Sequence, residues 1–197
     1  MAAATNADAS KAARLVISRI HTRFDEEKTT AAASVLLHEA GGEMKYFVLL
    51  KLLYLADRES WLKYNRPITG DDYVSMDHGP VLSTTYNLIL DDSEGPWADA
   101  IERFVRYVKL RGEPDYTALS EAEIKILKEA YHLYKMISQW KLRDFTHTLP
   151  EWTDPKGSSI PITPEDILRA LEKGPEEIDE ARQEALERAE FQEIFGT

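Results

Sequence analysis

The stretch EMKYFVLLKLLYLADRESWLKY, residues 43–64, decides the fold that we expect for this chain. Its first half is apolar nearly all the way round, and a helix of that kind is buried on several sides. We therefore predict a mostly α fold: a single compact helical domain built around this central buried helix.

Helical periodicity, caps and helix-breaking residues extend this prediction along the chain. Apolar residues at helical spacing precede the central segment, and Ser120 with Glu123 predicts a capping box. Thr163-Pro164 reads as a helix start, and Gly174-Pro175 opens a last helix. The expected helices are Ser10–Phe24, Thr29–Ala40, Pro80–Leu90, Ser120–Ile137, Gln139–Phe145 and two more after residue 163.

We expect at most a small short-stranded element, because few stretches read as extended. Tyr73-Val74 fits a very short strand, whereas Trp97–Leu110 fits a helix in part and an extended segment over Phe104–Leu110. The resulting divisions are an N-terminal helix (1–28), a main domain (29–160) and an acidic C-terminal helical extension (161–197).

Charge argues against a nucleic-acid partner. The chain has 24 basic and 35 acidic residues, a net charge of −11, whereas phosphate binding requires clustered lysine and arginine. The chain has no cysteine, which is compatible with a reducing compartment. It shows no signal-peptide pattern, and no apolar run is long enough to span a membrane. We expect a cytoplasmic protein without membrane contact.

The sequence offers little support for catalysis. Its five histidines are scattered without zinc-motif spacing, and neither a nucleophile motif nor a phosphate-binding glycine loop is present. We therefore expect no enzyme activity, no metal and no cofactor.

Asp57 shares a helical face with Leu50, Tyr54 and Trp61. A carboxylate on an apolar face is costly unless it is paired. It is either a structural anchor, satisfied by backbone N–H groups or by Arg66 or His78, or a functional carboxylate at a pocket. The structural reading is favoured, since ion-pair networks also perturb carboxylates.

Two further motifs have alternative readings. In His78-Gly79-Pro80, glycine and proline suit the turn into a helix, while His78 either shares that role or faces a partner. In the loop after His147, Trp152 either plugs the edge of the core or anchors a partner.

Together these motifs resemble the Panacea domain, the SocA-like antitoxin family. The block 51–89, KLLYLADRESWLKYNRPITGDDYVSMDHGPVLSTTYNLI, resembles the family's K-L-L-Y helix, its Arg-Pro turn and its Gly-Pro-Val element. The stretch LRDFTHTLPEW resembles its Thr-His and Trp element, and the likeness spans about Thr30–Trp152. The chain departs from the pattern at Asn65, where the family often has glycine.

The resemblance implies an antitoxin of a type II toxin–antitoxin pair, with phage defence as a possible setting. It would neutralise a neighbouring-gene protein toxin, an inhibitor of translation or growth, by direct binding. Two alternatives remain open: a proteolytic adaptor that delivers the toxin to a protease, and an enzyme that reverses the toxin's product using Asp57 and His78.

We expect the interface around the Pro80 helix and the Arg66–Asp77 loop, with the extensions as a further option. The candidate partner-binding residues are Asp57, Arg66, Asp71, Asp72, His78, Tyr86, His147 and Trp152. The residues expected to maintain the motif's structure are Lys51, Tyr54, Pro67, Gly79 and Pro80.

Overall fold

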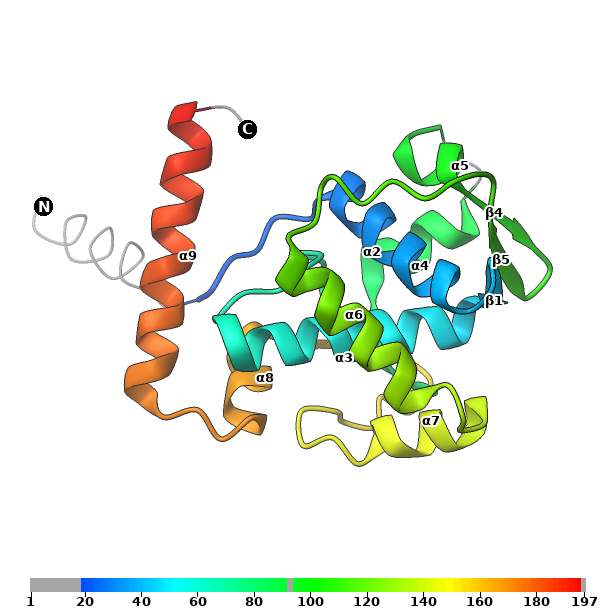
Figure 1. Ribbon diagram of the computed structural model, residues 1–197. Coiled ribbons are helices and arrows are strands. Elements are labelled where there is room, and N and C mark those ends of the chain that lie inside the picture. Colours follow the sequence, from blue (N-terminus) through cyan, green and yellow to red (C-terminus); the bar gives the residue numbers. More distant parts are fainter. Residues whose placement is uncertain (1–18, 92–93, 196–197) are drawn as a thin grey trace, which may run out of the picture.

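The computed structural model describes residues 19–91 and 94–195 (Figure 1). It is mostly helical, with two small three-stranded antiparallel sheets. The helices are α2 (Glu26–Glu39), α3 (Tyr46–Tyr64), α4 (Ser83–Leu90), α5 (Pro96–Ala100), α6 (Glu121–Tyr134), α7 (Gln139–His147), α8 (Pro164–Ala170) and α9 (Pro175–Phe195). No described helix is both long and apolar enough to cross a membrane.

Helix α3 is buried without interruption from Leu49 to Asp57. It packs against α2, α6, α7 and strand β3, and its C-terminus is at Asn65, whose φ of 51° is left-handed. The helix begins at Tyr46, three residues later than predicted. The three residues before it, predicted as helical, instead form strand β1 (Glu43–Lys45). This strand pairs with residues more than sixty positions away in the sequence.

The first sheet has the order β1-β5-β4, with β4 (Ile101–Phe104) and β5 (Tyr107–Leu110) forming a hairpin. This sheet settles the structure of the stretch 97–110: the first residues are in the short helix α5, and the rest form two strands joined by a turn at residues 105–106. Val108 is the inward-facing residue of β5 and is fully buried.

The second sheet has the order β3-β2-β6, built from β2 (Tyr73–Met76), β3 (Gly79–Leu82) and β6 (Ile160–Ile162). The predicted strand at Tyr73-Val74 is confirmed, but the prediction of a helix from Pro80 is wrong. Pro80 is in β3, opposite Ser75, and α4 begins only at Ser83. An edge strand accommodates proline because its outer side requires no N–H donor. Two sheets also exceed the single small strand element that we expected.

The local helix signals are confirmed. Ser120 and Glu123 form the predicted capping box of α6, and Thr163 with Asp166 forms another at α8. Of the helix predicted over Ser10–Phe24, residues 10–18 are outside the described part of the chain, and Arg19–Phe24 are not helical.

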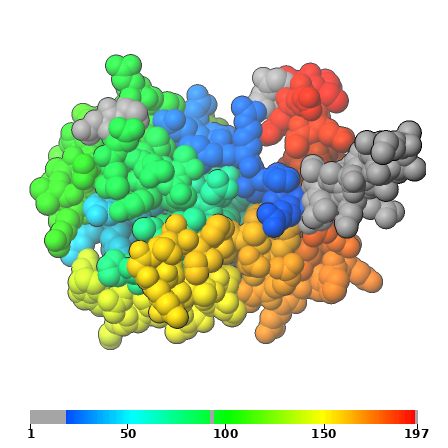
Figure 2. Space-filling view, turned by 180° about the vertical axis from the view of Figure 1, so that it is seen from behind, coloured from blue at the N-terminus to red at the C-terminus, as the bar shows by residue number. Residues whose placement is uncertain are grey.

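The C-terminal helix α9 lies at one end of the molecule and the β4–β5 hairpin at the other (Figures 1 and 2). Helix α9 contacts the rest of the fold through Ile178, Ala181 and Ala185, which are buried. Glu165 of α8 accepts a hydrogen bond from the Ile20 amide at 2.6 Å. Its carboxylate also forms an ion pair with Arg182 of α9 at 3.6 Å. These contacts place the C-terminal extension against the start of the described chain.

Candidate functional site

A buried lysine lies beneath Gly79 and Pro80, at the start of strand β3. Lys51 Nζ donates to the Pro80 carbonyl oxygen at 2.6 Å, and its side chain is fully buried. Burial lowers the pKa of this ammonium to about 7. Gly79 has a φ of 94°, and a Cβ built on it would lie 2.9 Å from Lys51 Nζ. Lys51, Gly79 and Pro80 thus form one packed unit.

The C-terminal end of α7 closes this unit from the other side. Thr146 is buried and its Oγ1 would lie 2.5 Å from a Gly79 Cβ. The His147 ring stacks on Trp152 with ring centroids 4.1 Å apart and planes 10° apart. Burial, with the nearby Lys51 charge, lowers the pKa of His147. Trp152 Nε1 donates to the Met76 carbonyl at 3.1 Å, so the indole connects the Thr-His element to β2.

His78 is exposed at the turn between β2 and β3, and its ring meets that of Phe47 edge-on at 6.2 Å. His147 and Trp152 are half-buried. These three side chains therefore lie around the Lys51 unit while remaining accessible to a partner.

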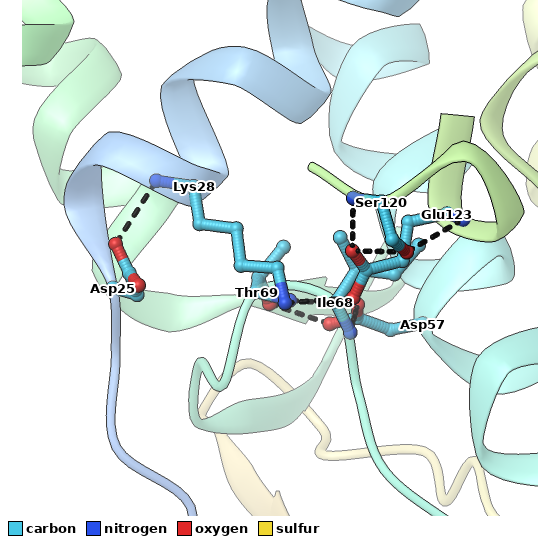
Figure 3. Close-up of polar contacts among 7 residues, drawn as sticks. All are labelled: Asp25, Lys28, Asp57, Ile68, Thr69, Ser120 and Glu123. Atoms are coloured by element: carbon cyan, nitrogen blue, oxygen red, sulfur yellow. Dashed lines mark hydrogen bonds and ion pairs between the residues drawn. The ribbon is translucent and has the colours of Figure 1, made fainter. Parts of the chain in front are cut away.

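Asp57 is held by four hydrogen bonds, and Figure 3 shows those from Ile68 and Thr69. Its Oδ1 accepts from the amides of Ile68 and Thr69 at 2.8 and 3.1 Å. Its Oδ2 accepts from the Thr69 hydroxyl at 2.5 Å and from the Tyr73 hydroxyl at 2.9 Å. Burial raises the pKa of Asp57 to about 6, although the hydrogen bonds oppose that shift. The expected backbone N–H partners are present, whereas Arg66 and His78 are not among its hydrogen-bond partners.

Asp71 caps helix α4 from outside that helix. Its carboxylate accepts from the Thr84 amide at 2.8 Å and from the Thr85 amide at 2.7 Å. The Thr85 hydroxyl donates to it at 2.6 Å, and the Ser83 amide donates to the Asp72 carbonyl at 2.8 Å. The Asp71-Asp72 segment therefore satisfies the first amides of α4, which would otherwise lack partners.

A third buried carboxylate lies at the end of the Thr-His element. Glu151 Oε1 accepts from the Tyr54 hydroxyl at 2.9 Å and from Arg58 Nε at 2.7 Å. Burial and the Glu151 carboxylate raise the pKa of Tyr54 well above its usual value. The Tyr54 of the motif thus joins α3 to the loop that carries Trp152.

The structure separates the predicted site residues into two groups. Asp57 and Asp71 are buried, and their carboxylates accept the hydrogen bonds described above. The accessible residues are the exposed Arg66, Asp72 and His78 and the half-buried Pro67, Tyr86, His147 and Trp152. No group of three or more His, Cys, Asp or Glu side chains in residues 19–91 and 94–195 is arranged to hold a metal ion.

Sequence reasoning missed an exposed apolar surface where α6 meets α7. We call it the α6–α7 corner; it consists of Leu133, Met136, Ile137 and Trp140. Met136 is 86% exposed and Trp140 54% exposed. The Arg143 guanidinium lies over the Trp140 ring at 5.2 Å. In the sequence these residues resemble the apolar positions of any amphipathic helix, so their exposure was not predictable.

These elements define a mostly helical domain whose buried Lys51, Asp57 and Asp71 hold the turns around β2 and β3. Residues 49–153 match the family described as antitoxin SocA-like, Panacea domain. This match covers more than half of the chain, and the chain belongs to that family. No curated protein and no solved structure matches the chain.

Proposed function

We propose that this protein is the antitoxin of a type II pair and neutralises a protein toxin, an inhibitor of translation or growth, by binding it directly. The observation that carries the proposal is the match to the SocA-like antitoxin family over residues 49–153. Because the toxin's target would be inside the cell, we propose that the antitoxin acts in the cytoplasm.

The α6–α7 corner is the surface that we assign to the toxin. Contiguous exposed apolar side chains mark protein interaction sites more often than ordinary surface. Trp, Met and Arg are also enriched at the centres of interfaces. Here Arg143 lies over Trp140, and the exposed Met136 is in the turn that leads into α7.

This corner adjoins the family motif through a single helix. Helix α7 begins beside Trp140 and ends with Thr146 and His147, which pack against Gly79 at the start of β3. A partner on the outer side of α7 would therefore extend from the corner towards His78 and Trp152. We propose His78 and Trp152 as secondary contacts, with Arg66 and Asp72 at the edge of the interface.

The test is a titration against the protein encoded by the neighbouring gene, in a reconstituted translation assay without proteases. Direct masking predicts rescue that saturates near one antitoxin per toxin. Rescue at much lower amounts would instead indicate an enzyme, and rescue only after a protease is added would indicate an adaptor.

Variants localise the interface. Met136→Glu and Trp140→Glu place charges at the corner, and each is expected to weaken toxin binding by about a hundredfold, as for a central interface residue. Leu90→Glu is the matched control, because Leu90 is another exposed apolar residue but lies at the end of α4. Corner variants that bind like the control would refute the assigned surface while leaving the antitoxin role intact.

His78→Ala and Trp152→Ala test the secondary contacts. Each is expected to weaken neutralisation with the domain still folded, as judged by circular dichroism. Full neutralisation by both variants would remove these residues from the interface.

A further inference from the structure

The tip of the β4–β5 hairpin carries a second exposed apolar surface, different from the α6–α7 corner. Phe104, Val105 and Tyr107 are all exposed, and Val105 is 82% exposed. The rings of Phe104 and Tyr107 stack with centroids 5.6 Å apart and planes 14° apart. Val105 has a φ of 54°, a left-handed conformation that is rare for a β-branched residue. Backbone strain of this kind is concentrated at functional sites.

This hairpin is basic although the chain is acidic. Arg103, Arg106 and Lys109 are exposed around the apolar tip, and none pairs with a carboxylate of the described residues within 4.0 Å. The chain as a whole has a net charge of −11. We call residues 103–109 the basic hairpin surface. It is complementary to a partner surface that carries both apolar and acidic side chains.

The end of α9 has that chemistry. Phe191, Ile194 and Phe195 are exposed, and the rings of Phe191 and Phe195 lie 4.5 Å apart. Glu187, Glu190 and Glu193 are exposed between and beside them. Residues three and four apart share one side of a helix, so Glu187, Glu190, Phe191 and Ile194 line a common stripe. We call residues 187–195 the acidic α9 end.

The two surfaces cannot meet within one chain. In both views of the molecule α9 lies at one end and the β4–β5 hairpin at the opposite end (Figures 1 and 2). Any contact between them therefore joins two copies of the chain.

We propose that the protein forms a two-fold symmetric dimer in which the acidic α9 end of each copy binds the basic hairpin surface of the other. Two-fold symmetry makes the contact twice and closes the assembly. Each contact needs to bury about 600 Å² to reach the roughly 1,200 Å² lower bound of a standard interface. Six large apolar side chains with six complementary charges are suited to an area of that size. The dimer requires no toxin and is independent of the antitoxin role.

The test is sedimentation equilibrium of the full chain over the micromolar range, supported by light scattering. Each of two double variants reverses the charge of one surface. One is Arg103→Glu with Arg106→Glu, and the other is Glu187→Arg with Glu190→Arg. Either is expected to raise the dimer dissociation constant by at least about tenfold, since like charges then face each other. A chain with all four substitutions restores opposite charges and is expected to regain the dimer. Added salt is expected to weaken the wild-type dimer.

Glu176→Arg with Glu180→Arg is the matched control. It makes the same charge change on the same helix, at two exposed glutamates four residues apart instead of three, but at the buried-contact end of α9, and is expected to leave the dimer intact. Circular dichroism verifies that every variant is folded.

Two results would overturn the proposal. One is a wild-type chain that stays monomeric at every concentration. The other is a dimer that neither surface reversal weakens. If hairpin reversal abolishes toxin neutralisation while the mass stays at the wild-type value, the hairpin belongs to the toxin interface and the dimer assignment is also wrong.

Discussion

Lys51 Nζ lies 2.6 Å from the carbonyl oxygen of Pro80, and this bond joins the middle of α3 to the edge strand β3. Both residues are buried. An ammonium has three donors, and burial without a carboxylate partner disfavours its charged form. The low pKa of Lys51, about 7, follows from this environment.

This pKa predicts that the stability of the protein depends on pH. The unfolded lysine has a pKa of about 10.4, so between pH 7 and 10 the unfolded state binds more protons. The free energy of unfolding should therefore rise with pH over that window, by up to about 1.4 kcal/mol per pH unit from this group. Other groups also titrate there, so the informative quantity is the difference between wild type and Lys51→Met in urea denaturation.

Lys51→Met retains an unbranched side chain of similar length but cannot ionise. The wild-type protein should gain stability relative to this variant as the pH rises from 7 to 10. Parallel pH profiles for the two proteins would show that Lys51 is protonated when folded.

Gly79→Ala should destabilise the protein by roughly 2–4 kcal/mol, from left-handed backbone strain and overpacking together. The added Cβ would lie 2.5 Å from Thr146 Oγ1 and 2.9 Å from Lys51 Nζ. The control is Gly112→Ala, where no atom lies within 4 Å and φ is not left-handed. Urea denaturation of both variants gives the comparison; equal midpoints would contradict the close packing at Gly79.

The parts of the fold that were predictable are those that depend on neighbouring residues. The capping boxes at Ser120 and Thr163 are local patterns, because the capping residue and its hydrogen-bond partner lie three residues apart. The backbone donors to Asp57 were predictable too, since a carboxylate on a buried helical face needs hydrogen-bond donors.

The predictions that were wrong concern structure that depends on contacts between residues far apart in the sequence. Glu43–Lys45 continues the helical pattern of α3 and becomes a strand only because Lys109, Val108 and Tyr107 lie opposite. Pro80 suits both the first turn of a helix and an edge strand, and its pairing with Ser75 decides between them. The exposure of Met136 likewise depends on which elements leave it uncovered.

Asp57→Asn should lower the stability by about 1.5–3 kcal/mol, the range for hydrogen bonds to a charged group. The Thr69 hydroxyl already accepts from the Asp71 amide, and the Tyr73 hydroxyl accepts from Trp61 Nε1. Both hydroxyl protons are therefore directed at Asp57 Oδ2, where an amide nitrogen would present two further protons. Tyr73→Phe removes one such donor and should cost about 1 kcal/mol. Thermal denaturation at pH 7 ranks the two variants; a smaller loss for Asp57→Asn than for Tyr73→Phe would contradict this network.

Asp71→Ala should destabilise the protein by about 2 kcal/mol, because it removes the cap of α4 and leaves the amides of Thr84 and Thr85 and the Thr85 hydroxyl without their acceptor. The helix has no substitute, since its own N-cap residue Leu82 has no side-chain acceptor. Asp72→Ala is the control: this exposed neighbour contributes only its backbone carbonyl, and its loss should change stability by less than about 0.5 kcal/mol.

Hydrogen exchange distinguishes this capping role from a direct contact with the toxin. In Asp71→Ala the amides of Thr84 and Thr85 should exchange faster, because their acceptor is the Asp71 carboxylate. Toxin binding should weaken only as far as the unfolded fraction increases. If instead Asp71→Ala abolishes binding at a temperature where it is fully folded and both amides remain protected, then Asp71 contacts the toxin. The turn that precedes α4 would in that case be part of the interface and not only its support.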